Sequence, residues 1–397
     1  MNLAIITCGM LPIPAVQGGA VENLIDFYLE YNNREKLHDI TVFSPWDKRV
    51  KNNPALSSDM NHYIYIDVNS LKARIERRVY KYFHSNEYFN YFIEYYFEKV
   101  FSKLSKNKYD YIILENSPGH ALKLSRRGYK NLILHLNNEL RDSRSQYHKE
   151  IINSFSLILT CSNYIKERVF AIQPCRNIQT LYNAIDTKKF LLHDMLQIKR
   201  NKIGLNNDDF VIAYSGRINK DKGVSELIDS ILMINNPQIK LMIIGGTFYG
   251  NTNNEDEFVR TLKDKARTIE DKIVFTGFVS YDKIPSYLHL ADIAVLPSMW
   301  EEPFGLTIIE AMAAGLPLIT TRSGGVPEIC ETVATIVDRK NIVNNLTTAI
   351  LDLYYNAEKR KDMAAAALER AKLFDKEYYS KKFFTLINEL KSNSYNT

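Results

Sequence analysis

Short apolar runs alternate with helical patterns along the chain, and the alternation occurs twice over. Runs of this length between polar segments are typical of strands that helices bury on both faces. Such alternation predicts an α/β fold with doubly wound parallel sheets. The first half carries predicted strands at 3–7, 39–43, 63–66, 111–114, 132–136, 157–160 and 178–181, and the second half carries them at 210–214, 240–244, 273–275, 293–296, 318–320 and 335–337.

The length of the chain, 397 residues, fits two domains of ordinary size. A polar stretch after a turn at 182–186 marks the boundary. Residues 1–190 are therefore predicted to form one Rossmann-like domain and residues 191–375 a second. The last helix, within 376–397, is expected to return to the first domain. Because ligands of open α/β sheets bind beyond the carboxyl ends of the strands, two facing domains would form an interdomain cleft for a ligand.

The charge balance argues against bulk nucleic-acid binding. The chain carries 51 Lys and Arg against 46 Asp and Glu, which gives a net charge of +5. Its four cysteines form no CxxC pair, so neither a zinc site nor a disulfide framework is expected, and a reducing compartment fits. No apolar run approaches the roughly 18 residues of a membrane span. We therefore expect a cytoplasmic protein with no nucleic-acid partner.

Residues 296–328 contain the strongest candidate site. Glu302 and Glu310 flank a turn at 303–305 and the start of a predicted helix, whose unpaired N–H groups suit a phosphate. Eight residues of helix span roughly 12 Å, which exceeds the ~5–9.5 Å between paired hydrolase carboxylates. The two acids are therefore better placed to hold separate hydroxyl-bearing parts of one long ligand, such as a nucleotide sugar. In the alternative interpretation, Glu302 caps the helix and Glu310 is solvated.

Two further loops follow predicted strands and lead into helices. Arg217 and Lys222 lie after the first strand of the second half, in the loop and at the start of the predicted helix that follows. A cation at the start of a helix is unfavourable for the helix dipole, so its presence needs a reason. A bound diphosphate would supply one. Gly18 and Gly19 precede a predicted helix at 20–31 and permit close backbone approach to an anion. The alternatives are two solvated cations and a turn that merely needs glycine.

Two single residues complete the candidates. His135 lies near the carboxyl end of a predicted parallel strand, where it can hydrogen-bond a bound sugar or serve a structural role. Phe278 follows the predicted strand at 273–275, in a segment whose backbone can read the edge of a nucleobase. The ring of Phe278 fits the core of the domain equally well.

Residues 71–101 combine basic and aromatic side chains in a predicted helix pair. Such a pair lies either on an anionic membrane surface or against the first domain, with its rings in the core and its basic face in water. The sequence slightly favours the second interpretation. The basic residues are Lys72, Arg74, Arg77, Arg78 and Lys81, and the aromatic residues are Tyr80, Tyr82, Phe83, Tyr88, Phe89, Tyr91, Phe92, Tyr95, Tyr96 and Phe97.

Together these motifs resemble the retaining glycosyltransferases of family 4, which have the GT-B architecture of two facing Rossmann-like domains. The resemblance covers nearly the whole chain. Its most specific part is EEPFGLTIIEAMAAGLPLITTRSGGVPEI, where Glu302 and Glu310 match the family's E-x7-E pattern. Other matching segments are PIPAVQGGAVENL, SGRINKDKGVSELI, FTGFVSYDKI and LYNAIDTKKF. In the last of these, Asn183 and Ala184 stand where the family more often has Asn-Gly.

The resemblance implies roles for the candidate residues. Arg217 and Lys222 would hold the donor diphosphate in the C-terminal domain, and Glu310 would bind the ribose hydroxyls. Glu302 would lie beside the transferred sugar, which His135 would contact from the acceptor-side N-terminal domain. No metal and no other cofactor is expected. The remaining donor-binding residues would be Gly18, Gly19, Phe278, Phe304, Gly305, Leu306 and Thr307.

We therefore expect an enzyme that moves a hexose-type sugar from a nucleoside diphosphate sugar to a saccharide or lipid-linked acceptor. A UDP-sugar is the favoured donor, and capsule, polysaccharide or glycolipid synthesis is the expected setting. No protein nucleophile is evident, so attack by the acceptor on the face of the leaving group would retain the anomeric configuration. Two alternatives stay open: a UDP-sugar epimerase of the same architecture, and a non-catalytic surface or coat protein that keeps the fold.

Overall fold

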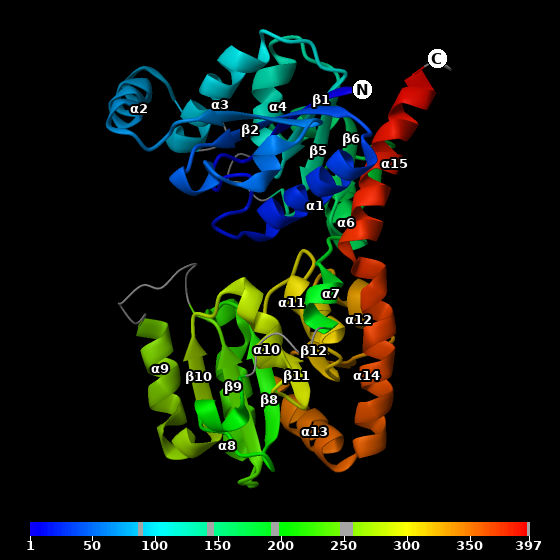
Figure 1. Ribbon diagram of the computed structural model, residues 1–397. Coiled ribbons are helices and arrows are strands. Elements are labelled where there is room, and N and C mark those ends of the chain that lie inside the picture. Colours follow the sequence, from blue (N-terminus) through cyan, green and yellow to red (C-terminus); the bar gives the residue numbers. More distant parts are fainter. Residues whose placement is uncertain (86–89, 141–146, 192–197, 247–256, 395–397) are drawn as a thin grey trace. The chain divides into compact units, whose positions relative to one another are not determined.

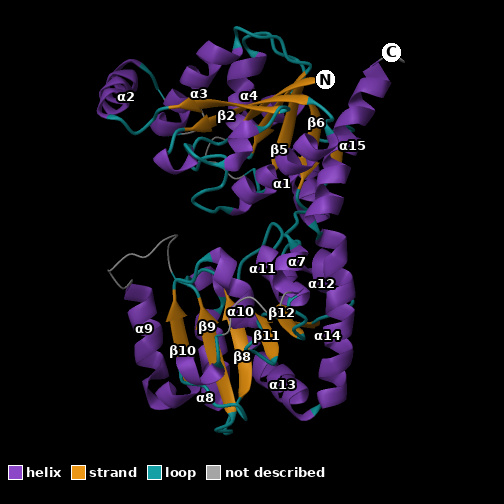
Figure 2. Cartoon of the chain, viewed as in Figure 1, coloured by secondary structure: helices purple, strands orange, loops and turns teal. Residues whose placement is uncertain are grey.

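The computed structural model describes residues 1–85, 90–140, 147–191, 198–246 and 257–394 (Figure 1). It divides into two compact units. The first comprises Met1–Asn183 and Lys376–Thr397, and the second comprises Ala184–Asp375. Each unit has its own parallel sheet flanked by helices (Figure 2). The predicted α/β class with two Rossmann-like domains is therefore confirmed.

The sheet of the first unit has the strand order β3-β2-β1-β4-β5-β6-β7 among the described residues, and every pairing is parallel. The order reverses between β1 and β4, which is the switch point of a doubly wound sheet. The strands are β1 (Asn2–Ile6), β2 (Asp39–Pro45), β3 (Asn61–Ile66), β4 (Tyr111–Glu115), β5 (Leu132–Leu136), β6 (Phe155–Thr160) and β7 (Ile178–Thr180). The helices are α1 (Ala20–Glu35), α2 (Leu71–Phe83), α3 (Tyr91–Leu104), α4 (Pro118–Ser125), α5 (His148–Asn153), α6 (Asn163–Ile172) and α15 (Lys376–Ser394).

The described part of the second unit has a parallel sheet in the order β10-β9-β8-β11-β12-β13, with its switch point between β8 and β11. The two strands at the switch point are buried along their whole length, which explains their continuous apolar sequences. The strands are β8 (Phe210–Ser215), β9 (Ile239–Ile244), β10 (Ile273–Gly277), β11 (Ile293–Leu296), β12 (Leu318–Thr321) and β13 (Thr335–Val337). The helices are α7 (Thr187–Leu191), α8 (Val224–Met233), α9 (Glu257–Ala266), α10 (Ile284–Leu288), α11 (Leu306–Ala313), α12 (Val326–Cys330), α13 (Ile342–Tyr355) and α14 (Ala357–Ala371).

The first unit ends at Asn183 rather than at residue 190, where the sequence places the boundary. The residues that follow are attached to the second unit by hydrogen bonds. The Ile185 N–H donates to the Phe374 carbonyl at 3.0 Å, and the Thr187 hydroxyl donates to Asp375 Oδ2 at 2.5 Å. Helix α7 therefore belongs to the second unit.

Helix α15 packs on α1, so the end of the chain completes the first unit. The Phe383 ring is fully buried and stacks on Tyr28, with ring centroids 4.1 Å apart and planes inclined by 3°. Arg34 on α1 forms two hydrogen bonds with the Glu377 carboxylate at 2.9 and 2.5 Å. The burial of aromatic rings, rather than this exposed ion pair, stabilises the contact.

Replacing Phe383 with alanine should lower the unfolding free energy of the first unit by about 3–5 kcal/mol, because the change removes a large buried ring and leaves a cavity. Urea denaturation followed by circular dichroism measures the effect. Lys382→Ala, an exposed position on the same helix, is the matched control and should change stability by less than about 0.5 kcal/mol. A loss below about 1 kcal/mol in Phe383→Ala would show that α15 does not pack on α1 as described.

The predicted pair at 71–101 consists of α2 and α3, and the two helices differ in exposure. On α3, Tyr95, Tyr96 and Phe97 are buried in the first unit, as the core interpretation requires. On α2, large apolar side chains face outward. Tyr88 and Phe89 lie outside the described residues. No helix in the described part of the chain has the length and apolar character to cross a membrane.

Candidate active site

Three loops meet at the carboxyl edge of the second sheet, next to its switch point. They follow β8, β11 and β12, and two glycines allow their close approach. A Cβ atom on Gly223 would lie 1.9 Å from the Pro297 carbonyl oxygen, and one on Gly324 would lie 2.1 Å from the Glu302 carbonyl oxygen. Both glycines also have positive φ, at 70° and 49°. Any other residue at either position would push these loops apart.

Lys222 and Glu302 form an ion pair where these loops meet. Lys222 Nζ and Ser298 Oγ both donate to Glu302 Oε1, the serine at 2.7 Å. The ammonium also lies 5.5 Å from the centre of the Trp300 ring. The backbone of Glu302 is fixed as well, because its N–H donates to Ser323 Oγ at 3.2 Å. Lys222 is therefore not a freely solvated cation, and the Glu302 carboxylate faces Lys222 rather than capping α11.

The N-terminus of α11 opens beside the same edge of the sheet. Gly305, with φ of 125°, precedes the helix, and no hydrogen bond from a described side chain caps it. Thr307 lies close to the end of β8, since a Cβ atom on Gly216 would be 3.9 Å from Thr307 Cγ2. Leu306 and Thr307 are only half-buried. The first N–H groups of α11 therefore lie near the loop that carries Arg217 and Lys222, as a phosphate site requires.

Glu310, four residues into α11, is a buried carboxyl group with 6% of its surface exposed. Burial raises its pKa to about 7, and a hydrogen bond from Tyr281 offsets part of this rise. Burial, together with the charge of Glu310, raises the pKa of the Tyr281 hydroxyl. Tyr281 begins a short helical turn (Tyr281–Lys283) after β10. The solvated interpretation of Glu310 is therefore wrong, and a hydroxyl-bearing ligand would give this carboxylate further donors.

The other three predicted residues of the second unit differ in exposure. Arg217 is exposed and makes no ion pair with any described residue. Phe278 is 47% exposed, which excludes a place in the core. The Phe304 ring is buried and packs edge-on against Phe374, with centroids 5.9 Å apart. The role of Phe304 in shaping a sugar pocket stays a prediction, since its ring packs in the interior of the second unit.

In the first unit, the glycine loop before α1 already holds a carboxylate. Gly18 and Gly19 have φ of 73° and 113°. A Cβ atom on Gly19 would lie 2.1 Å from Glu22 Oε2, and the Glu22 carboxylate accepts a hydrogen bond from its own backbone N–H. Burial raises the pKa of Glu22. A phosphate that approached this helix end would have to displace Glu22, a residue that the sequence patterns did not single out.

His135 lies in the interior of the first unit, beside a buried carboxylate. Its side chain is fully buried, and Nδ1 lies 2.9 Å from Glu115 Oε2. The Tyr28 hydroxyl donates to the other oxygen of Glu115 at 2.8 Å. The rings of Tyr379 and Phe383 on α15 lie 6.2 and 6.0 Å from the imidazole. The other ring nitrogen, Nε2, is buried without a hydrogen-bond partner among the described residues, so the contact of His135 with a sugar stays a prediction.

Asn137, two residues further along, shares with His135 a buried polar side chain that is not fully paired. It follows β5 at the carboxyl edge of the first sheet, where ligands of this fold class bind. Both side-chain amide atoms are buried without a hydrogen-bond partner among the described residues. The backbone N–H of Asn137 donates to Asn116 Oδ1 at 3.2 Å. The sequence shows that Asn137 follows a strand, but not that its amide lacks partners.

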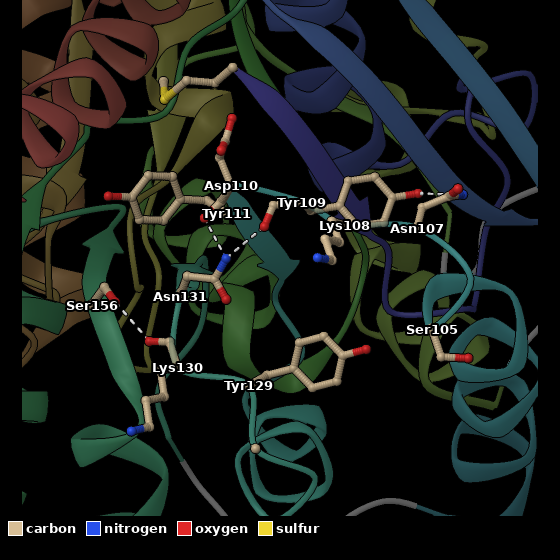
Figure 3. A pocket seen from close by; sticks show the side chains of 12 residues that line it. Ser105, Asn107, Lys108, Tyr109, Asp110, Tyr111, Tyr129, Lys130, Asn131 and Ser156 are labelled. Carbon is tan, nitrogen blue, oxygen red and sulfur yellow. Dashed lines mark hydrogen bonds between the residues drawn. The ribbon is translucent and has the colours of Figure 1, made fainter.

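A cavity of about 810 Å³ lies at the opposite, amino edge of the first sheet (Figure 3). Its walls include Tyr109 and Asp110 before β4 and Asn131 before β5. The Asn131 amide donates to the Tyr109 carbonyl at 2.8 Å, and Ser156 Oγ donates to the Lys130 carbonyl at 3.0 Å. The lining groups thus bond to one another, and this edge is not where doubly wound sheets bind ligands. The cavity is distinct from the candidate site.

Comparison with known proteins gives one family match within the second unit. Residues 197–370 match the family model of glycosyl transferases group 1. The described two-sheet architecture is the GT-B fold, which the chain shares with the solved structure reported below.

Two curated relatives and one solved structure extend the likeness to nearly the whole chain. The chain is 29% identical to the putative glycosyltransferase YtcC of Bacillus subtilis over 97% of its own length and 91% of the relative's. It is also 29% identical to spore coat protein SA of the same organism, over 83% of each chain. The fold is similar to that of Anabaena Alr3699/HepE in complex with UDP, with a TM-score of 0.75 between the two structures. The two sequences are 19% identical, and the match covers 98% of this chain and 100% of that chain.

Proposed function

We propose that the chain is a retaining glycosyltransferase that moves a sugar from a UDP-sugar to a saccharide or lipid-linked acceptor. The observation that carries the proposal is the meeting of the Lys222–Glu302 pair with the uncapped start of α11 at the switch point of the second sheet. A diphosphate needs both the cation and the N–H groups. The similarity to a protein crystallised with UDP supports a uridine nucleotide as donor.

The proposed mechanism follows from where charge develops. When the bond between the sugar C1 and the phosphate oxygen breaks, the diphosphate gains negative charge and the sugar ring gains positive character. Lys222, Arg217 and the first N–H groups of α11 stabilise the departing diphosphate without a metal. Glu302 holds the Lys222 ammonium in place, and Glu310 accepts hydrogen bonds from the ribose hydroxyls.

The acceptor hydroxyl attacks C1 on the face from which the diphosphate leaves. A new bond forms between C1 and the acceptor oxygen, and the leaving phosphate oxygen takes the acceptor's proton. The anomeric configuration is retained. We place the reaction on the cytoplasmic side of the cell membrane, in the assembly of a capsule, another cell-surface polysaccharide or a glycolipid.

The test is to incubate the full chain with UDP-, GDP- and dTDP-sugars, with and without saccharide acceptors, and to follow the products by NMR. The proposal expects a new glycoside only when an acceptor is present, with the anomeric configuration of the donor. Conversion of a UDP-sugar without acceptor would instead identify an epimerase. An inverted product would disprove the retaining mechanism.

A non-catalytic coat role is the second candidate, because one relative at 29% identity is a spore coat protein. Two features argue against this role, the Lys222–Glu302 pair and the buried Glu310 carboxyl. Ion pairs and buried acids of this kind are not needed for folding, so their presence favours a ligand site. Isothermal titration calorimetry with UDP separates the two. Absence of any binding heat at saturating UDP would favour the coat role.

A further inference from the structure

Helix α2 exposes a row of large apolar side chains. At roughly 100° per residue, Leu71, Ile75, Val79 and Tyr82 fall within a sector of about 80° on the helix surface. Each of these side chains is more than half exposed, as is that of Phe83 at the end of the helix. Figure 1 shows α2 as the outermost helix on its side of the first unit, packed on α3. A contiguous exposed patch of this kind marks an interaction surface.

The opposite face of α2 is held in place by α3, so the apolar row cannot turn inward. Glu76 accepts hydrogen bonds from the Tyr95 hydroxyl at 2.8 Å and from Lys99 Nζ at 2.6 Å. The Arg77 guanidinium lies 4.8 Å from the centre of the Phe92 ring. These contacts fix the rotation of α2 about its own axis.

The outer face of α2 also carries a one-sided positive charge. Arg74, Arg78 and Lys81 fall within a sector of about 60° that adjoins the apolar row. Lys72 flanks the row on its other side, where its ammonium lies 3.9 Å from Glu76 Oε1. All four are exposed, whereas Glu76, the single acid of the helix, faces α3. The exposed surface of α2 therefore pairs an apolar stripe with an excess of cations over its single acid.

We propose that α2 binds the surface of a bilayer that contains anionic lipid. The apolar row would enter the boundary between headgroups and acyl chains, and the flanking cations would bind lipid phosphates. Charge complementarity favours this occupant over a second copy of the chain, because two copies of α2 would bring like charges together. The proposed membrane contact is therefore assigned to α2 rather than to all of residues 71–101, since Tyr95, Tyr96 and Phe97 on α3 are buried. A membrane contact on α2 suits the proposed transfer of sugar to a lipid-linked acceptor. Its test measures vesicle binding and needs neither donor nor acceptor.

The test is co-sedimentation of the full chain with vesicles of phosphatidylcholine, with or without phosphatidylglycerol. The apolar variant carries Ile75→Ser, Val79→Ser and Phe83→Ser, and the charge variant carries Arg74→Gln, Arg78→Gln and Lys81→Gln. All six positions are exposed, so both variants should fold, which circular dichroism checks. The controls are Phe170→Ser, an exposed ring on α6, and the triple change Lys103→Gln, Lys106→Gln and Lys108→Gln at exposed positions of the same unit.

We expect the chain to bind vesicles with anionic lipid and to bind less as salt rises. Because each cation near an anionic surface contributes roughly fivefold in binding, the charge variant should bind at least tenfold more weakly. The apolar variant should show a similar loss, and the controls should bind like the parent chain. Equal binding by parent and variants, or no binding by the parent, would overturn the proposal. So would self-association of the parent that the apolar variant abolishes while vesicle binding persists. None of these outcomes bears on sugar transfer.

Discussion

Replacing Lys222 with alanine should lower the rate of sugar transfer by about 10²–10³-fold, the usual cost of removing one fixed group that stabilises charge in a transition state. The ammonium is already placed by the Glu302 carboxylate before any donor arrives. Its position therefore costs no reorganisation when the diphosphate departs. Initial rates with a saturating UDP-sugar and acceptor measure the effect.

Lys220→Ala is the matched control, because Lys220 is an exposed cation in the same short turn and makes no ion pair with any described residue. Its transfer rate should stay within a factor of about three of the parent rate, since exposed charges contribute little. If Lys222→Ala lost no more activity than Lys220→Ala, the assignment of Lys222 would be wrong.

The loss of activity must be separated from a loss of folding. Lys222→Ala leaves Glu302 without its cation in a site where only 11% of the carboxylate side chain is exposed, so the unfolding free energy should fall by roughly 1–3 kcal/mol. The double variant Lys222→Ala/Glu302→Ala removes the unpaired charge and should regain part of this stability. It should not regain activity. Recovery of the transfer rate in the double variant would contradict the proposed role of Lys222.

Replacing Glu310 with glutamine should stabilise the free protein at high pH and weaken nucleotide binding. The folded carboxyl keeps its proton up to about pH 7, whereas the unfolded one loses it near 4.5. The unfolding free energy of the parent chain therefore falls as pH rises through this window, by roughly 3 kcal/mol at 1.36 kcal/mol per pKa unit. Glutamine has no charge to bury, so the variant should match the parent near pH 4.5 and exceed it by up to roughly 3 kcal/mol at pH 8.

The affinity for UDP should change in the opposite direction. Hydrogen bonds to a charged group contribute about 1.5–3 kcal/mol, so Glu310→Gln should bind UDP at least tenfold more weakly at pH 8. Urea denaturation across this pH range and calorimetry with UDP measure the two effects. Glu369→Gln, at an exposed position of the same unit, should change neither. A stability difference that does not vary with pH would show that Glu310 does not titrate as described.

The fold followed from the sequence because buried parallel strands leave a clear pattern. Strands with both faces covered need continuous apolar runs, and β8, with the sequence FVIAYS, is buried throughout. The position of the first boundary did not follow, since hydrogen bonds from Ile185 and Thr187 to the distant residues Phe374 and Asp375 decide which unit holds α7. No local pattern reports such a contact.

The site was only partly predictable for the same reason. The spacing of Glu302 and Glu310 is a local feature, so the motif was visible. The partners Ser298 and Tyr281 were not, because they meet these acids only through folding. The surroundings of His135 could not be predicted either. The rings of Tyr379 and Phe383, on α15 from the far end of the chain, lie beside it only through folding.

A crystal structure of the chain soaked with UDP tests the central claim most directly. We expect the diphosphate beside Lys222 and the first N–H groups of α11, and the ribose hydroxyls on Glu310. UDP bound elsewhere, for example in the cavity at the amino edge of the first sheet, would contradict the proposed site. So would the absence of bound UDP at a saturating concentration.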